Sequence, residues 1–114
     1  MQSRSVEDMA DYTIDKMCDY FQEKVKDFVI SDLIDDMNYR SFIIEFNAYN
    51  YFPMRFCYDK GRISCGICFG TRVIRLNNRQ KWWEEIDLEV YFKELQSDIE
   101  LRIPDKYLKA HGWL

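Results

Sequence analysis

The feature that most constrains the fold is a change in the spacing of apolar residues about a third of the way along the chain. Within residues 14–29 the apolar side chains recur at intervals of three and four, which places them on one face of a helix. Beyond that segment they fall on every second position, as in a strand with one face on a core. These positions are Phe42, Ile44, Phe46 and Ala48. The change predicts a helical first third followed by a sheet.

The first pattern predicts a long N-terminal helix over residues 6–30. Ser5 is suited to cap it, because a serine hydroxyl accepts a hydrogen bond from the first turn. Glu7 and Asp8 lie in that turn, where the helix dipole favours acidic side chains. A second, short helix is expected over residues 31–37.

Turn signals divide the alternating segment into an antiparallel meander of three to four strands. Pro53 has no N–H to donate, so it is expected to end the pairing of the first strand. The Asp-Lys-Gly run at residues 59–61 predicts a hairpin turn of type I, closed by glycine in the left-handed region. A slip in the alternation after Gly70 predicts a bulge or a second turn there. Asn77-Asn78 is expected to end the sheet.

A C-terminal helix is predicted after Asp87, which can act as its N-cap. Its buried stripe is expected to comprise Leu88, Phe92, Leu95 and Ile99. The order of helix, meander and helix predicts an α+β fold with two layers, in which the helices pack on one face of an antiparallel sheet. A chain of 114 residues without a linker is expected to form a single domain over residues 1–114.

The formal net charge of −4 conceals a sorting of charge along the chain. Residues 1–38 carry ten acidic and four basic side chains, and residues 39–81 carry two acidic and eight basic ones. Residues 82–114 again carry eight acidic and four basic side chains. The two predicted helical segments are therefore acidic, whereas the predicted sheet is basic.

Two groups of acidic residues are candidate surfaces for a basic partner. Acids recur at every fourth position of the predicted N-terminal helix, where like charges repel; this acidic ridge comprises Asp11, Asp15, Asp19, Glu23 and Asp27. In the Trp–acid cluster, two tryptophans precede a group of acids: Trp82, Trp83, Glu84, Glu85, Asp87 and Glu89. The alternative is that the acids only solubilise a helix face and that the tryptophans pack in the core. Tolerated repulsion and tryptophans beside acids favour docking of a partner.

The basic segment allows a different hypothesis. Its positive side chains on or beside the predicted sheet are Arg55, Arg62, Arg72, Arg75, Arg79 and Lys81. With Tyr49, Tyr51 and Tyr58 nearby, they are compatible with a small module that binds single-stranded RNA. The overall acidity and the lack of an RNP-like motif oppose a phosphate partner. The favoured interpretation is that these arginines pair with the acids of the two helices.

Motifs for catalysis, metals or cofactors are not recognisable. The one histidine is His111, and no glycine pattern matches a phosphate-binding loop. The pair Cys65 and Cys68 lies in a strand-like run without a matching second pair of zinc ligands. Cysteine also behaves as a small buried hydrophobe, so reduced thiols in the core are the favoured interpretation. The prediction is a protein that is not an enzyme and has no cofactor.

The expected compartment is the cytoplasm. Apolar runs do not approach the roughly 18 residues that cross a bilayer, and the acidic start of the chain lacks the apolar region of a secretory signal. Four cysteines without such a signal are expected to remain thiols.

The last third of the chain resembles the tails of small bacterial immunity proteins, which are encoded beside polymorphic toxins, including those of contact-dependent growth inhibition systems. The resemblance rests on the run Trp-Trp-Glu-Glu-Ile-Asp at residues 82–87, on Leu-Arg-Ile-Pro-Asp-Lys-Tyr-Leu at residues 101–108, and on His-Gly-Trp at residues 111–113. It implies a cytosolic, non-enzymatic inhibitor that binds its cognate toxin domain and blocks the active site or substrate surface. Many such toxins are nucleases with basic clefts, which an acidic inhibitor suits.

Binding residues do not carry over from that family by position. The toxin-binding surface is therefore assigned from the two acidic groups described above. It comprises Trp82, Glu84, Glu85, Asp87 and Glu89, together with Asp11, Asp15, Asp19 and Glu23.

Overall fold

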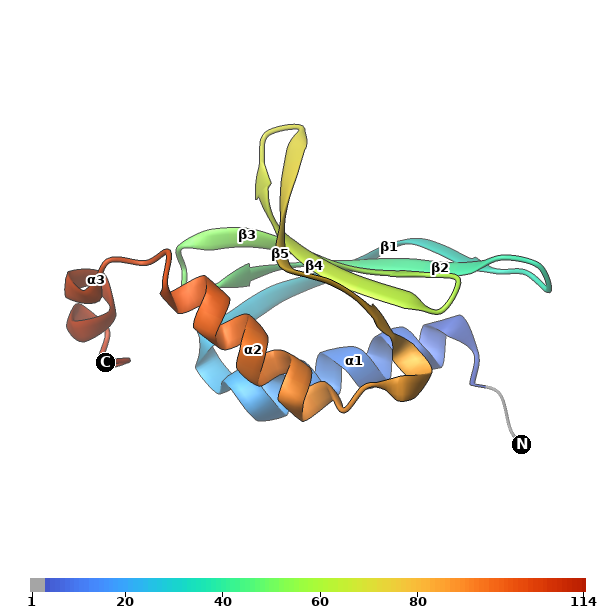
Figure 1. Cartoon of the computed structure of the whole chain (residues 1–114), viewed down its shortest axis with the longest axis horizontal. Coiled ribbons are helices and arrows are strands. Elements are labelled where there is room, and N and C mark those ends of the chain that lie inside the picture. Colours follow the sequence, from blue (N-terminus) through green and yellow to red (C-terminus); the bar gives the residue numbers. More distant parts are fainter. Residues whose placement is uncertain (1–3) are drawn as a thin grey trace.

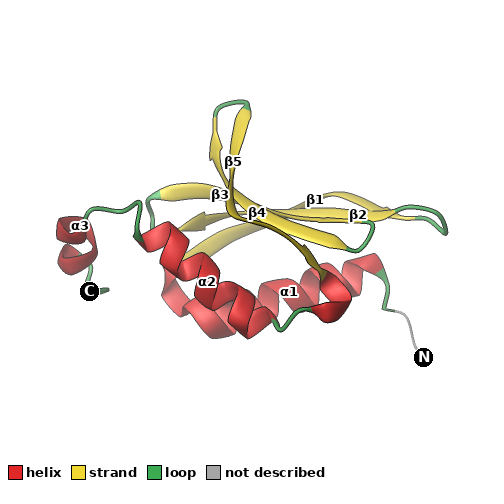
Figure 2. Ribbon diagram, viewed as in Figure 1, coloured by secondary structure: helices red, strands yellow, loops and turns green. Residues whose placement is uncertain are grey.

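The computed structural model describes residues 4–114, apart from the side chains of residues 77–80. Its elements in chain order are α1 (Val6–Phe21), the 3-10 helix η1 (Gln22–Lys24), β1 (Val25–Asp35), β2 (Arg40–Ala48), β3 (Phe52–Asp59), β4 (Arg62–Phe69), β5 (Arg72–Trp82), the 3-10 helix η2 (Trp83–Glu85), α2 (Leu88–Glu100) and α3 (Asp105–Ala110). The strands form one antiparallel meander in the order β1-β2-β3-β4-β5. Helices α1 and α2 pack side by side on one face of this sheet (Figures 1 and 2). The predicted α+β class is confirmed, but the sheet has five strands rather than three or four.

The long N-terminal helix predicted over residues 6–30 is wrong beyond Phe21. Gln22 adopts a φ of 55°, which an α-helix cannot continue through. The chain then turns back along the sheet as β1, whose register with β2 places Ile30 beside Ile44. The short helix expected over residues 31–37 is also absent, since most of that segment belongs to β1.

Irregularities in β1 explain why its sequence looked helical. Asp27 and Asp32 have φ values of 60° and 49°, and the pairing with β2 shifts at both places. An extra residue in a strand lengthens the spacing of inward side chains from two to three. Val25 is buried and Phe28 stacks on Phe46. These two inward residues are therefore three positions apart, a spacing that is typical of a helix face.

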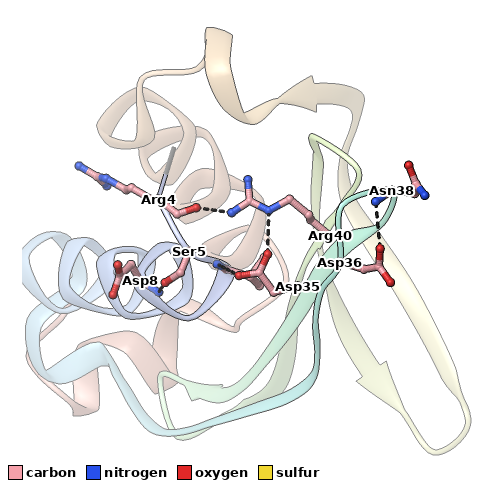
Figure 3. A network of polar contacts seen from close by, with 8 residues as sticks. Arg4, Ser5, Asp8, Asp35, Asp36, Asn38 and Arg40 are labelled. Atoms are coloured by element: carbon pink, nitrogen blue, oxygen red, sulfur yellow. Dashed lines mark hydrogen bonds and ion pairs between the residues drawn. The ribbon is translucent and has the colours of Figure 1, made fainter. Parts of the chain in front are cut away.

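The start of α1 is tied to the β1–β2 hairpin by one carboxylate. The backbone N of Val6 donates to Oδ2 of Asp35 over 3.1 Å, and Nε of Arg40 donates to Oδ1 over 3.2 Å (Figure 3). Arg40 also donates to the backbone oxygen of Arg4. The predicted N-cap is confirmed as well, because Ser5 Oγ accepts from the first turn.

The last two turns between the strands lie at the predicted positions, although the first of them is not of the predicted type I. Lys60 and Gly61 have φ values of 50° and 92°, the signature of a two-residue type I′ hairpin turn. A second turn at Gly70 is confirmed. Beyond it, β5 continues through residues 77–78 to Trp82, so the predicted end of the sheet there is wrong. The β4–β5 hairpin bends away from the helices as an arm (Figure 1).

Pro53 does not end the pairing of its strand. It lies in β3, opposite Asn47 of β2. The strand it was expected to terminate ends earlier, at a turn where Tyr49 and Asn50 both have positive φ. Pairing of β3 with β4 begins only at Met54, so the proline lies where one neighbouring strand is missing, a position that tolerates it.

The core lies between the helices and one face of the sheet, which we call the covered face. Alternate residues of β2, β3 and β4 are buried there: Phe42, Ile44, Phe46, Met54, Phe56, Tyr58, Ile63, Cys65 and Ile67. The expected stripe of α2 is confirmed, with Tyr91 in addition to the four predicted residues. Phe69 continues the alternation of β4, but it lies at the tip of the arm and is 51% exposed.

Candidate functional site

A groove between α1 and α2 brings together residues from both predicted acidic groups. It has a volume of about 290 Å³. Its lining residues are Tyr12, Lys16, Asp19, Tyr20, Asp87, Leu88, Glu89 and Phe92. Asp19 comes from the acidic ridge, whereas Asp87 and Glu89 come from the Trp–acid cluster. This helix groove is the place where the fold joins surfaces that are far apart in the sequence.

Helical spacing explains which residues of α1 reach the helix groove. Tyr12, Lys16, Asp19 and Tyr20 follow one another at intervals that keep them on one side of a helix. The adjoining side of α1 is buried, as Met17 shows. The two tyrosines and the lysine were not predicted as site residues, although their spacing of four along the predicted helix was a usable signal.

The start of α2 supplies the other wall of the groove. As predicted, Asp87 is the N-cap, and its Oδ1 accepts from the backbone N of Glu89 over 2.9 Å. Leu88 and Phe92 are buried and hold this turn against the core. Acidic side chains are stabilised at a helix N-terminus by the dipole, so the helix itself favours negative charge at this wall.

The electrostatic environment of the groove is negative. Burial raises the pKa of Tyr20, and the charges of Glu89 and Glu100 raise it further. Burial likewise raises the pKa of the neighbouring Cys18, with a further contribution from the acidic ridge. In both cases nearby carboxylates favour the neutral, protonated form of the side chain.

Tyr12 offers a ring face that attracts cations. The guanidinium carbon of Arg4 lies 4.2 Å from its ring centroid, and Nζ of Lys16 lies 5.5 Å from it. Tyr20 is held in place by α2, because its hydroxyl donates to Oε1 of Gln96 over 2.7 Å. The groove therefore combines carboxylates with an aromatic surface suited to a positively charged side chain.

A second groove lies between β5 and α2, and it divides the Trp–acid cluster. This edge groove has a volume of about 330 Å³ and is lined by Lys81, Trp82, Glu85, Ile86, Asp87, Val90, Tyr91 and Glu94. Asp87 lines both grooves, whereas Trp82 and Glu85 belong to the edge groove and Glu89 to the helix groove. Lys81 partly neutralises the edge groove, since its Nζ lies 3.7 Å from Oε1 of Glu94.

The two tryptophans have different environments. Trp83 is half-buried and packs edge-on against Tyr12 and Tyr58, with ring centroids 6.2 and 6.0 Å apart. Trp82 is 43% exposed, and the guanidinium of Arg62 lies 5.2 Å from its ring centroid. Trp83 thus has a packing role, and Trp82 is the one that remains accessible.

The other predicted toxin-binding residues are exposed but line neither groove. These are Asp11, Asp15, Glu23 and Glu84. The acidic ridge ends where α1 ends, because Glu23 lies in η1 and Asp27 lies in β1. There the carboxylate of Asp27 accepts from Nδ2 of Asn47 over 3.2 Å.

Pairing of the sheet arginines with helix acids is largely wrong. Among the residues whose side chains are described, Arg40 pairs with Asp35 and Arg55 pairs with Glu45, both within the sheet. Lys81 is the basic residue that reaches a helix, through Glu94. Arg62, Arg72 and Arg75 are exposed, and the predicted Arg79 lies outside the described side chains. Neighbouring strands supplied nearer carboxylates than the helices did.

Aromatic residues required by the RNA hypothesis are mostly in the core. Tyr49 is fully enclosed, and its hydroxyl donates to Oε2 of Glu100 over 2.5 Å. Burial and this contact raise the pKa of Tyr49. Tyr58 is buried and stacks on Phe42. Of the three tyrosines in that hypothesis, only Tyr51 is exposed.

Cysteines and the histidine occupy separate places. Cys65 is buried on the covered face and Cys68 points to the other face of β4, so the two do not form a chelating pair; all four thiols are free. His111 is exposed, and its Nδ1 lies 2.9 Å from the backbone oxygen of Tyr107. Across the described part of the chain, no three His, Cys, Asp or Glu side chains are placed to hold a metal ion.

None of the helices within residues 4–114 is both long and apolar enough to span a bilayer. Comparisons of the chain with protein-family models, curated proteins and solved structures found no match.

Proposed function

We propose that this chain is an immunity protein that binds and neutralises a cognate bacterial toxin domain with a basic surface, of the kind that nucleases use for phosphate. The observation that supports it best is the helix groove, where three acids and one lysine line the same cavity as two tyrosines: Asp19, Asp87, Glu89, Lys16, Tyr12 and Tyr20. This arrangement is suited to an arginine or lysine of a partner protein, which would find carboxylates and a ring face together.

The charge of the groove supports recognition of a cationic protein surface. An acidic surface speeds encounter with a basic partner and disfavours acidic ones. Occupation of a nuclease's basic cleft by such a surface would exclude its phosphate substrate. In this proposal Trp82, at the neighbouring edge groove, supplies an accessible aromatic contact of the type enriched at binding hot spots.

The test is co-expression of the chain with the toxin domain encoded immediately upstream, followed by titration of the purified pair. The expected result is rescue of growth and a one-to-one complex whose association rate falls as salt rises. No rescue together with no complex would contradict the proposal.

Charge reversal at Glu89 tests the groove itself. Glu89→Lys should weaken the complex by about tenfold or more, since it removes one attraction and adds one repulsion. Glu7→Lys is the matched control, because both residues are exposed glutamates in the first turn of a helix and both changes carry the same dipole cost. Equal affinities of the two variants would place the toxin elsewhere.

A further inference from the structure

The face of the sheet opposite the helices, the open face, contains a hollow of about 630 Å³. Side chains from all five strands line it. Exposed apolar residues form part of its wall, among them Leu33, Ile34 and Val73, each 39% exposed. No helix covers this face in the described chain (Figure 1).

One cross-strand row forms the centre of the hollow. The register pairs Glu45 with Arg55, Arg55 with Gly66, and Gly66 with Arg75. Side chains at paired positions point to the same face, so the two arginines flank a position that has no side chain. Their strands are two strand spacings, or about 10 Å, apart, a gap that a carboxylate between two guanidinium groups can bridge.

Gly66 is explained by packing. A Cβ at this position would lie 2.6 Å from Cγ1 of Val73 and 2.7 Å from the backbone oxygen of Ile74. The close approach of β5 therefore requires glycine, and Val73 and Ile74 occupy the place directly above it. The arginines themselves point to a ligand.

The two arginines have unused capacity for an anion. Arg55 donates one Nη to Glu45 over 3.2 Å, but its Nε–H is buried without an acceptor in the described structure. Arg75 is exposed and makes no ion pair to a described residue. Within this cross-strand row one carboxylate thus faces two guanidinium groups, whereas the other acids of the hollow, Asp32 and Asp59, lie outside the row.

We propose that the hollow on the open face is a second binding site, which takes a carboxylate carried on an apolar segment of a partner protein and holds it between Arg55 and Arg75. Guanidinium groups bind carboxylates through charge-assisted hydrogen bonds, and the apolar wall accommodates the side chains beside the carboxylate. The site lies on the opposite face from the helix groove and does not depend on its function.

A protein segment suits the hollow better than a nucleic acid. Asp32 and Asp59 line one end of it, and they would repel a chain of phosphates, whereas a single carboxylate at the arginine row avoids them. Of the two tyrosines that line the hollow, Tyr58 is buried and Tyr39 is 38% exposed, so a single ring is accessible for stacking on a base. The charges therefore favour an isolated acidic group with apolar neighbours.

The probe for the test is the peptide acetyl-Val-Glu-Val-amide, titrated into the full ¹⁵N-labelled chain at low salt and followed by NMR. Shifts are expected at the amides of Cys57, Ser64 and Gly66, with a Kd of about 1 mM. The matched peptide acetyl-Val-Gln-Val-amide should bind about fivefold to tenfold more weakly, because it lacks the charge. No shift with the first peptide, or equal binding of the two, would overturn the proposal.

Variants locate the effect. Arg75→Gln should weaken the acidic peptide about fivefold, whereas Arg72→Gln should not, since Arg72 is an exposed arginine of the same strand that lies outside the hollow. Glu89→Lys should leave peptide binding unchanged, which separates this site from the helix groove. An oligothymidylate that shifts the same amides with a steep salt dependence would assign the hollow to nucleic acid instead and overturn the proposal.

Discussion

The two faces of the sheet are built from alternating residues of the same strands, yet they have opposite characters. On the covered face, Phe42, Ile44 and Phe56 are enclosed by α1 and α2. On the open face the intervening positions carry Ile43, Arg55, Cys57 and Ser64, all half-buried. Strand geometry sends successive side chains to opposite sides, so one run of sequence supplies both the core and a surface.

Along each strand, therefore, a residue sealed in the core and a residue accessible to solvent are direct neighbours in the sequence. Residues of the covered face hold the fold together because α1 and α2 seal them from water. Residues of the open face contact each other and solvent, and their polar groups pair across the strands, as Arg55 does with Glu45. Three measurements test how complete this separation is.

Thiol reactivity should give the largest contrast between the faces. In variants that keep only Cys65 or only Cys57, Cys65 should be labelled at least about 10³-fold more slowly, because its reaction requires opening of the core. Burial raises the pKa of both thiols. Both rates should therefore still be rising between about pH 7 and 9, since the thiolate is the reactive form.

The measurement is the rate of labelling with a disulfide reagent, monitored by absorbance. In denaturing urea the two variants should react alike, which serves as the control. Comparable rates in native buffer would show that the covered face is not sealed.

Two neighbouring isoleucines of β2 provide a matched pair for stability. Ile44 is fully buried on the covered face, whereas Ile43 is half-buried on the open face. Ile44→Ala should lower the free energy of unfolding by about 2–5 kcal/mol, because it leaves a cavity in the core. Ile43→Ala should cost about 1 kcal/mol. Urea denaturation of both variants measures the difference, and equal losses would mean that the open face is packed as tightly as the covered one.

Close packing of β5 against Gly66 gives a smaller expected effect. Gly66→Ala should lower the free energy of unfolding by about 1–3 kcal/mol, since the added Cβ contacts both the side chain of Val73 and the backbone of Ile74. The double variant Gly66→Ala, Val73→Ala should recover only part of the loss, because the backbone contact remains. A neutral Gly66→Ala in urea denaturation would show that β5 can move away from β4 at little cost.

Local signals predicted the second half of the chain better than residues 22–37. Asp87 and the stripe over residues 88–99 combine a cap with a regular apolar spacing, and both were confirmed. In β1 the spacing of apolar residues is misleading, because the positive φ of Asp27 and Asp32 alters it. Aspartates five residues apart in a run rich in β-branched side chains were the available clue, since aspartate tolerates positive φ.

In the candidate site, too, local signals predicted some features and not others. Charge patterns in the sequence predicted each acid of the helix groove separately. That Asp19 and Asp87 line the same groove depends on the packing of α1 beside α2. The acidic ridge was predicted to be continuous, and it is broken because α1 ends at Phe21. Pairing of Arg55 with Glu45 follows from strand register, which the sequence does not state.

The sequence by itself determined the alternating core of β2 to β4, the turns at residues 59–61 and at Gly70, the capped C-terminal helix and the sorting of charge, because each depends on residues close together in the chain. Tertiary structure decided that residues 25–35 form a strand, since β2 offers hydrogen bonds and apolar neighbours that no local pattern reveals. It also decided which charges meet, because the helix groove and the arginine row join residues from different elements, and that proximity exists only once the layers are packed.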